Sequence, residues 1–353
     1  MAVLGFAAQP EFLDGALNAQ EKTWLAQCKQ VKPEDLMDRH RHNLPQWLAD
    51  ALQAQLGAEF WPLVAALNQP GPLDLRVNAM KAKRADVLVA LKKVGIKSKA
   101  TPYAPAGLRL EGKPVLAKVE EFNNGSVEIQ DEGSQLLALL VDAKRGEMVV
   151  DFCAGAGGKT LALGEAMRNS GRLYAFDTSA HRLEGQKPRL ARSGLSNVHP
   201  VAIAHERDER IKRLAGKIDR VLVDAPCSGL GTLRRHPDLK YRNSLKTIAE
   251  YAALQGKILQ SAARLVKSGG RLVYATCSLL PQENEDNAIA FSQANPDFEP
   301  LSVAQLLGDL KVEKPEFLTS QPLENQPGSA SYLRLWPHRH QTDGFFAAVW
   351  VRK

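Results

Sequence analysis

The feature that most constrains the fold of this chain is an alternation of short apolar runs and helical stretches that begins near Gly146. The runs expected to form strands are Met148–Cys153, Leu173–Phe176, Val198–Ile203, Ile218–Val223 and Arg271–Thr276. The stretches expected to form helices are Thr160–Met167, His181–Ser193, Ile211–Leu214 and Leu245–Val266. Such alternation is typical of a mostly parallel sheet with helices on both faces, so we predict an α/β fold.

The last part of the chain departs from this alternation. Two strand-like runs, Tyr332–Trp336 and Phe345–Val351, flank a turn near Asp343 and Gly344. Successive strands joined by a turn pair antiparallel. We therefore expect a C-terminal antiparallel hairpin at one edge of the sheet.

The first 130 residues divide at the breaking sequence between Asn68 and Pro72. Before it, apolar residues recur at helical spacing, and after it short strands and a helix alternate. The expected helices are Phe12–Leu25, Leu44–Leu67 and Arg84–Val94, and the expected strands are Leu73–Asn78, Gly107–Leu110 and Val127–Gln130. We predict a helical N-terminal segment over residues 1–70, a small α+β subdomain over 71–130 and an α/β domain over 131–353.

The charge balance is compatible with a nucleic-acid partner but does not require one. Lys and Arg number 46 against 39 Asp and Glu, which gives a net charge of +7. A modest basic excess suits a polyanion such as RNA, and it also occurs in proteins that bind none. No apolar run approaches the roughly 18 residues that cross a bilayer. Met1–Ala8 also lacks the basic start of a secretory signal, so we expect a cytoplasmic protein without a membrane segment.

Four cysteines occur, and none has the spacing of a metal site. Cys28, Cys153, Cys227 and Cys277 form no C-x-x-C pair, and no His lies near them at zinc spacing. We expect no metal, and in a reducing compartment no disulfide. The thiols are therefore either inert or catalytic. Cys28, in the helical N-terminal segment, is interpreted as an ordinary thiol.

A glycine-rich loop between Asp151 and Thr160 follows the first expected strand. Glycines in such a loop let the backbone approach a ligand, and this crevice is the usual ligand site of an open α/β sheet. The loop alone also fits NAD, FAD or no ligand. A phosphate-binding P-loop is excluded because Cys153 occupies the place of its first glycine. Asp177 ends the second strand, where an acid accepts hydrogen bonds from ribose or caps the next helix, as Thr178 or Ser179 also could.

Two of the thiols lie at the ends of consecutive expected strands. Asp224-Ala-Pro-Cys227 follows one strand, and Thr276-Cys277 ends the next. The carboxyl ends of parallel strands open on one edge, so both thiols should face the cofactor cleft. A thiolate that adds to C6 of cytosine makes C5 nucleophilic, and a second thiol or a base then assists loss of the C5 proton. Asp224 is the candidate carboxylate beside N3 and the amino group of the base.

Several motifs in a fixed order resemble those of one enzyme family. They are Gln130–Ser134, the loop 151–160, Asp224–Gly229 with Arg234–Asp238, Ala275–Ser278 with Glu283–Glu285, and Pro337-His338 with Asp343–Phe346. Over residues 73–353 the chain is similar to the Sun/Fmu (RsmB-like) family of S-adenosylmethionine-dependent RNA cytosine-5 methyltransferases. The resemblance implies a class I methyltransferase fold, which is Rossmann-like, preceded by an RNA-binding subdomain.

The resemblance also implies roles for individual residues. Cys277 would be the nucleophile and Cys227 would help to release the product. The residues implied to contact S-adenosylmethionine or the target base are Cys153, Ala154, Gly155, Ala156, Gly157, Gly158, Lys159, Asp177 and Asp224. Ribosomal RNA is the expected substrate, transfer RNA the next candidate, and a monomer the expected state.

Two positions depart from the family pattern. Gly155-Ala156 replaces the usual Ala-Pro of the glycine loop, and loss of the proline makes the loop less rigid. His205 occupies the place of an acid at the end of the third strand, where the family has its contact near the adenine, and it is expected to contact the cofactor. Glu206 and Asp208 are the nearby acids that could replace it.

Basic residues follow the first cysteine motif closely. Arg234, Arg235, His236 and Lys240 are expected to contact RNA phosphates, or else to form a solvated basic loop. Arg76, with Lys81–Arg84, would extend the contact. Two other functions remain open: a DNA cytosine-5 methyltransferase that uses Cys227, and a non-catalytic RNA-binding assembly factor. Cys277 argues against the first, because a DNA enzyme does not need that second thiol.

Overall fold

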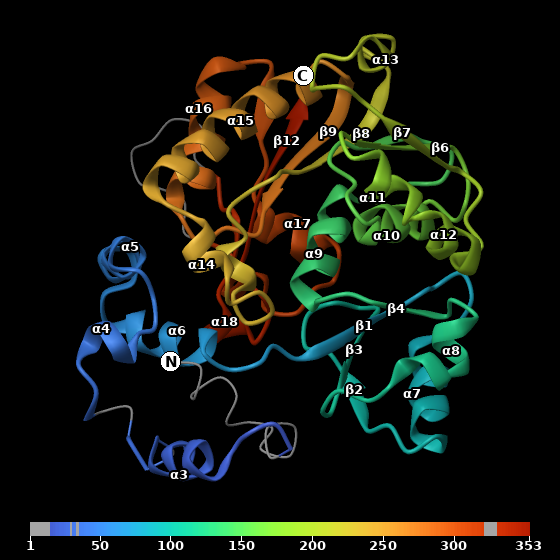
Figure 1. Cartoon of the computed structure of the whole chain (residues 1–353). Helices are drawn as coiled ribbons and strands as arrows, with labels where there is room; N and C mark the ends of the chain where they lie inside the picture. Colours follow the sequence, from blue (N-terminus) through green and yellow to red (C-terminus); the bar gives the residue numbers. More distant parts are fainter. Residues whose placement is uncertain (1–14, 29, 33–34, 321–329) are drawn as a thin grey trace.

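The computed structural model describes residues 15–28, 30–32, 35–320 and 330–353. Figure 1 shows a group of N-terminal helices, a small sheet with helices beside it, and a larger sheet covered by helices. Part of the first expected helix, residues 12–14, lies outside the described residues.

The N-terminal segment is helical, and its helices nearest the small sheet in sequence pack on the larger domain. Its elements are α3 (Ala19–Cys28), α4 (Asp38–Arg41), α5 (Gln46–Leu56), η2 (Gly57–Glu59) and α6 (Phe60–Leu67). The stretch expected as one helix over Leu44–Leu67 breaks at Gly57, whose φ is +54°. Side chains of α5 and α6 form one apolar cluster with Leu230, Leu279 and Trp336, which lie far along the chain.

The small sheet is antiparallel, with strand order β2-β3-β1-β4. Its elements are β1 (Leu73–Val77), α7 (Arg84–Lys93), β2 (Ser98–Ala100), β3 (Gly107–Leu110), η3 (Leu116–Lys118), α8 (Glu120–Asn123) and β4 (Val127–Ile129). Leu75 and Val77 pack in an apolar cluster with Val87 and Leu91 of α7. Because side chains alternate along a strand, Arg76 between them points to the opposite face. The short strand β2 was not predicted, since Ser98-Lys-Ala has no apolar pattern.

The larger sheet has the order β10-β12-β9-β8-β5-β6-β7, with β11 paired to β12. Its strands are β5 (Met148–Asp151), β6 (Arg172–Asp177), β7 (Val198–Ala202), β8 (Ile218–Asp224), β9 (Val266–Thr276), β10 (Phe298–Pro300), β11 (Leu333–Leu335) and β12 (Phe345–Arg352). Strands from β7 to β9 are parallel, and β12 is antiparallel to β9 and β11. The predicted parallel sheet and C-terminal hairpin are thus confirmed.

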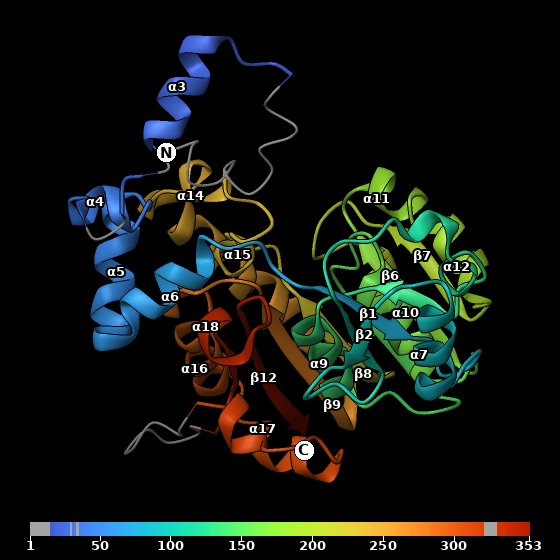
Figure 2. The same ribbon diagram turned by 90° about the horizontal axis from the view of Figure 1, so that it is seen from below.

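Helices cover both faces of this sheet (Figures 1 and 2). One apolar cluster joins the sheet to α9 (Glu132–Val141), α10 (Gly158–Ala166) and α17 (Val303–Asp309), and another joins it to α13 (Glu209–Lys212), α15 (Leu245–Ala263) and α16 (Glu285–Ala294). Successive residues face opposite clusters: Val149 and Val273 belong to the first, and Val150 and Tyr274 to the second.

One expected helix is two helices. The stretch His181–Ser193 forms α11 (Ala180–Glu184) and α12 (Lys187–Ser193). Pro188 lies in the first turn of α12, where a proline is tolerated because its missing N–H would have no helical partner. The break brings Gln186 and Arg189 toward the glycine loop, with consequences described below.

The sheet order reverses beside β5, which lies between β6 and β8. This reversal point is where ligands bind in open α/β sheets. Between β8 and β12 the chain also forms η4 (Leu230–Thr232), α14 (Leu239–Arg242), η5 (Pro281–Glu283), η6 (Pro315–Leu318) and α18 (Pro337–His340). Within the described ranges no helix is both long and apolar enough to span a bilayer.

Candidate active site

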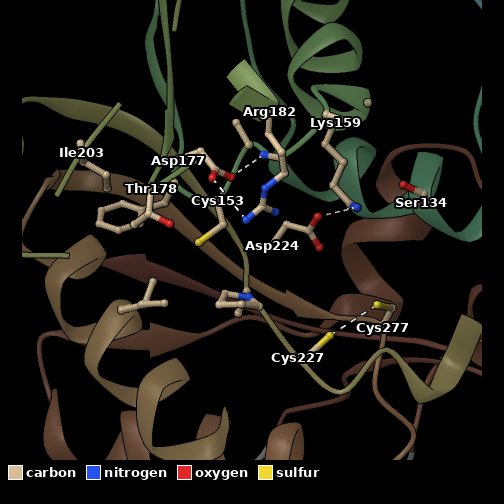
Figure 3. Close-up of a pocket in the computed structure, with 18 of the residues that line it drawn as sticks. Ser134, Cys153, Lys159, Asp177, Thr178, Arg182, Ile203, Asp224, Cys227 and Cys277 are labelled. Carbon is tan, nitrogen blue, oxygen red and sulfur yellow. Dashed lines mark hydrogen bonds and ion pairs between the residues drawn. The ribbon is translucent and has the colours of Figure 1, made fainter. Parts of the chain in front are cut away.

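A cleft of about 770 Å³ opens at the carboxyl edge of the larger sheet. Its walls come from the glycine loop after β5, the ends of β6 and β7, and the two cysteine segments after β8 and β9. Figure 3 shows side chains from all of these segments converging on the cleft. The residues expected to hold the cofactor and those expected to hold the thiols therefore share one cavity.

The glycine loop is strongly curved and braced from outside. Gly155 and Gly157 have φ values of +53° and +85°, in the left-handed region that favours glycine. The carbonyl of Gly155 accepts a hydrogen bond of 2.8 Å from Gln186 Nε2. The guanidinium of Arg189 donates to the carbonyl of Ala156. These two contacts hold the loop where the family's proline is missing.

Asp177 ties the end of β6 to the same loop. One carboxylate oxygen accepts from the backbone N–H of Gly155 at 2.8 Å, and the other accepts from Ser179 N at 2.7 Å. Arg182 approaches the carboxylate at 3.5 Å, as drawn in Figure 3. The helix cap proper is Ser179, whose hydroxyl accepts from the backbone of Arg182. Among the described residues, Oδ2 of Asp177 accepts only from Gly155, so it keeps a lone pair for a ligand in the cleft.

Of the two acids that follow β7, one is already used as a helix cap. Asp208 caps α13, and its carboxylate accepts from the backbone N–H groups of Ala204 and Arg210 at 2.9 Å each. These hydrogen bonds lower the pKa of Asp208 below its ordinary value. His205 and Glu206 both line the cleft. Glu206 is therefore the acid beside His205 that lines the cleft.

Lys159 and Asp224 form an ion pair on the cleft wall, with 2.8 Å between Nζ and Oδ2 (Figure 3). Lys159 belongs to the first turn of α10, and Asp224 ends β8. Burial by itself would lower the pKa of Lys159, but the charge and the hydrogen bond of Asp224, with contributions from Cys277 and Asp151, raise it overall. The ammonium group thus lies within electrostatic reach of both an acid and a thiol.

The two thiols predicted to act together are in contact. The sulfur atoms of Cys227 and Cys277 lie 3.4 Å apart. The pKa of Cys227 is raised well above its usual value, first by its hydrogen bond to Cys277, then by burial and by the charges of Cys277 and Glu283. Cys153 lines the same cleft, where burial raises its pKa, whereas Cys28 lies on α3 outside it. All four thiols are unpaired by disulfides.

The basic residues expected to contact RNA occupy different environments. Arg235 lines the cleft and joins Asp131 and Asp343, so three separate sequence motifs meet at one guanidinium. Arg234 donates to the carbonyl of Thr342 at 3.1 Å. His236 is exposed, while Lys240 is buried and its pKa is lowered by that burial.

Arg76, which was expected to contact RNA phosphates, is buried and not exposed on the surface. Its guanidinium is buried and pairs with Glu165 of α10, with 2.8 Å between Nη2 and Oε1. It also donates to the Gln130 side chain and to the carbonyl of Gly158. Pointing away from α7, Arg76 joins the small sheet to the helix that starts at the glycine loop.

Four residues of the site were not singled out from the sequence: Arg182, Gln186, Arg189 and Glu283. The first three lie in the stretch of α11 and α12 that follows Asp177. Polar side chains just after a strand that ends at a ligand site are the sequence feature that could have indicated them. Glu283 was noted only as part of a motif. Among the described residues no group of three or more His, Cys, Asp or Glu is placed to hold a metal ion.

Comparison with known proteins places this geometry in a family. A family model described as 16S rRNA methyltransferase RsmB/F matches residues 138–351. A second model, the ferredoxin-like domain of RsmF/B-like methyltransferases, matches residues 44–116. The chain belongs to the RsmB/F methyltransferase family. The predicted class I methyltransferase architecture, with a small α+β subdomain before it, is thereby confirmed.

Individual relatives agree with this assignment. The probable ribosomal RNA small subunit methyltransferase B of Bacillus subtilis is 37% identical over 88% of this chain, and the match spans 66% of that protein. The ribosomal RNA small subunit methyltransferase B of Citrobacter koseri is 34% identical, with coverage of 97% of this chain and 74% of that protein. The crystal structure of a methyltransferase homologue from Pyrococcus horikoshii superposes with a TM-score of 0.75 at 31% identity, covering 92% of this chain and 100% of that one.

Proposed function

We propose that this protein transfers a methyl group from S-adenosylmethionine to C5 of a cytosine in RNA, with ribosomal RNA as the substrate class. The observation that carries the proposal is the 3.4 Å contact between the Cys227 and Cys277 sulfur atoms in a cleft shared with the Lys159–Asp224 pair. Relatives named as ribosomal RNA small subunit methyltransferases support the substrate class.

The cleft has the size and donor set that S-adenosylmethionine needs. Its volume of about 770 Å³ is within the range of cofactor sites. The loop is open beside Gly155, because a Cβ added there would lie 3.8 Å from its nearest neighbour, the Arg182 guanidinium. Asp177 and Glu206 would hold the ribose and the adenine side. When bound, S-adenosylmethionine supplies an electrophilic methyl group.

Cys277 is assigned as the nucleophile. Its thiolate adds to C6 of the target cytosine, so a sulfur–carbon bond forms and the displaced electron pair makes C5 nucleophilic. Lys159 provides a cation near the attacking sulfur, and Asp224 lies on the same wall to hydrogen-bond the N3 and amino side of the base. The base must leave its stack, or be single-stranded, to reach this depth.

Cys227 is assigned to the second half of the reaction. Its hydrogen bond to Cys277 and the charge of that residue are two causes of its raised pKa. Bonding of Cys277 to carbon removes both, so the pKa of Cys227 falls once the adduct exists and its thiol can release its proton to solvent. The Cys227 thiolate then accepts the C5 proton. The electron pair of the C5–H bond restores the ring double bond, and the Cys277–C6 bond breaks with Cys277 leaving as thiolate. The order of the two steps is thus coupled through one sulfur–sulfur contact.

The experiment compares two single variants on RNA. Cys277→Ala should abolish methyl transfer and form no covalent complex. Cys227→Ala should accumulate an RNA–protein complex that survives SDS, because elimination is slowed. Full turnover by Cys277→Ala would overturn the assignment, as would absence of any adduct in both variants.

Two controls separate the alternatives. The same assays on cytosine-containing DNA test a DNA methyltransferase that uses Cys227, which predicts the opposite variant pattern. Calorimetry with S-adenosylmethionine tests the non-catalytic assembly factor, because an enzyme of this kind must bind the cofactor. No binding at millimolar cofactor would rule out the enzyme.

A further inference from the structure

A fully buried carboxylate, Glu283, lies between the two cysteine segments. One oxygen accepts from the backbone N–H of Ser228 at 2.9 Å and from Gln255 Nε2 at 3.0 Å. The other accepts from the hydroxyl groups of Ser228 and Ser278. Ser228 directly follows Cys227, and Ser278 directly follows Cys277. One side chain therefore holds the residue next to each thiol.

The hydrogen-bonding capacity of Glu283 is fully used. A carboxylate offers about four lone-pair sites, and four donors point at Glu283. Glu283 forms none of the salt bridges found within the described part of the chain. Leaving a buried donor or acceptor without its partner costs free energy, so these contacts restrain Ser228 and Ser278.

The same segments are joined by their backbones. Gly231 N donates to the carbonyl of Cys277 at 2.8 Å, four residues after Cys227. The hydroxyl oxygens of Ser228 and Ser278 lie 3.1 Å apart. The backbone contact thus joins the two segments directly, and Glu283 joins them a second time through the serines.

We propose that Glu283 is a positioning residue that holds Cys227 and Cys277 at reacting distance by binding the residue after each of them. The proposal rests on the two-thiol function above and adds a residue to it. Glu283 touches neither the substrate nor the cofactor in this arrangement. It acts through Ser228 and Ser278, so its removal should disturb the relation between the thiols more than the cofactor site.

Glu283 also acts on Cys227 through its charge. This charge is one cause of the raised pKa of Cys227, after the hydrogen bond to Cys277, burial and the charge of Cys277.

The test measures how fast the two thiols form a disulfide, because this rate depends on the distance between the sulfur atoms. Diamide oxidises a close thiol pair: two thiols lose two protons and two electrons to form a disulfide, and the diazene is reduced to a hydrazine. The Cys227–Cys277 peptide link is then measured by mass spectrometry without RNA or cofactor. Glu283→Gln, which keeps the shape but loses the charge and one acceptor, should slow cross-linking about tenfold. It should also lower kcat for methyl transfer by about 10- to 100-fold, because a displacement near 1 Å has that cost.

Matched variants separate positioning from general destabilisation. Asp286→Asn removes an exposed acid three residues away and should leave cross-linking and kcat unchanged. Ser228→Ala and Ser278→Ala each remove one contact and should give intermediate effects. These two serine variants carry the test if Glu283→Gln melts below the assay temperature. The dissociation constant of S-adenosylmethionine should stay within twofold in all folded variants, whereas a loss of fold would weaken it.

The outcomes distinguish this proposal from the function on which it rests. The positioning role would be overturned if Glu283→Gln and both serine variants cross-linked as fast as the wild-type protein and had the same kcat. Slowed cross-linking in these variants, with an unmodified protein that methylates no RNA, would uphold the positioning of the thiols and reject the methyltransferase function. Slowed cross-linking with reduced kcat and unchanged cofactor affinity supports both.

Discussion

The sulfur atoms of Cys227 and Cys277 lie 3.4 Å apart although fifty residues separate them in the chain. The parallel pairing of β8 with β9 explains this contact, because Asp224 is the register partner of Ala275. Cys227 lies three residues after the end of β8 and Cys277 one residue after the end of β9, so both thiols leave the sheet at the same edge. The different roles proposed for the two thiols can therefore be tested by measuring the reactivity of each.

Alkylation of the thiols should follow their environments. Iodoacetamide at pH 7 should modify Cys277 before Cys227, because thiolate is the reactive form and the pKa of Cys227 is raised. Lys159→Met should slow modification of Cys277 several-fold by removing the nearby cation. Time-resolved peptide mass spectrometry gives both rates, with exposed Lys246→Met as the control. Faster modification of Cys227 than of Cys277 would contradict the assignment.

Gly231→Ala should destabilise the protein. A Cβ at this position would lie 2.2 Å from the carbonyl oxygen of Gly344 and 2.8 Å from that of Cys277. Relief of such overlap costs on the order of 1–3 kcal/mol of unfolding free energy. Gly256→Ala is the matched control, since its Cβ would meet only Asn287 at 3.8 Å in the middle of α15. That control should be neutral or slightly stabilising in urea unfolding.

Arg76 should matter for stability and not for RNA contact. Arg76→Met leaves the buried carboxylate of Glu165 without its cation, which costs roughly 3–5 kcal/mol. The double variant Arg76→Met with Glu165→Met should recover much of this loss, because neither charge is then stranded. Chemical unfolding measures both effects. RNA affinity of the double variant should keep its salt dependence; a slope reduced by about one charge would restore Arg76 as a phosphate contact.

Asp151 should make the protein less stable as the pH rises toward neutrality. Burial raises the pKa of this carboxyl to about 7, against 3.8 as its usual value. The folded state then holds a proton that the unfolded state releases, so stability falls by up to roughly 1.4 kcal/mol per pH unit between about pH 4 and pH 7. Asp151→Asn should flatten the melting temperature across this interval. Parallel curves for the two proteins would show that Asp151 does not titrate in this way.

Local pattern was sufficient for the outline of the fold. Strands such as Ile218–Asp224 are continuous apolar runs, since a central parallel strand is buried on both faces. The turn residues near Gly344 indicated where the last two strands separate. Because the cysteine motifs and the glycine loop each follow an expected strand, they could be predicted to lie at one edge of the sheet. These features depend on a few consecutive residues, so the chain itself contains them.

The partners of polar side chains were decided only by the tertiary structure. Arg76 is of a residue type that often contacts phosphates. Strand alternation and the position of β1 beside α10 direct its side chain toward Glu165 instead. Asp208 became a helix cap, which left Glu206 in the cleft. Glu283 contacts both cysteine segments only because η5 folds back beneath them. Sequence patterns give the periodicity of one segment, whereas each of these contacts depends on which distant segment lies opposite.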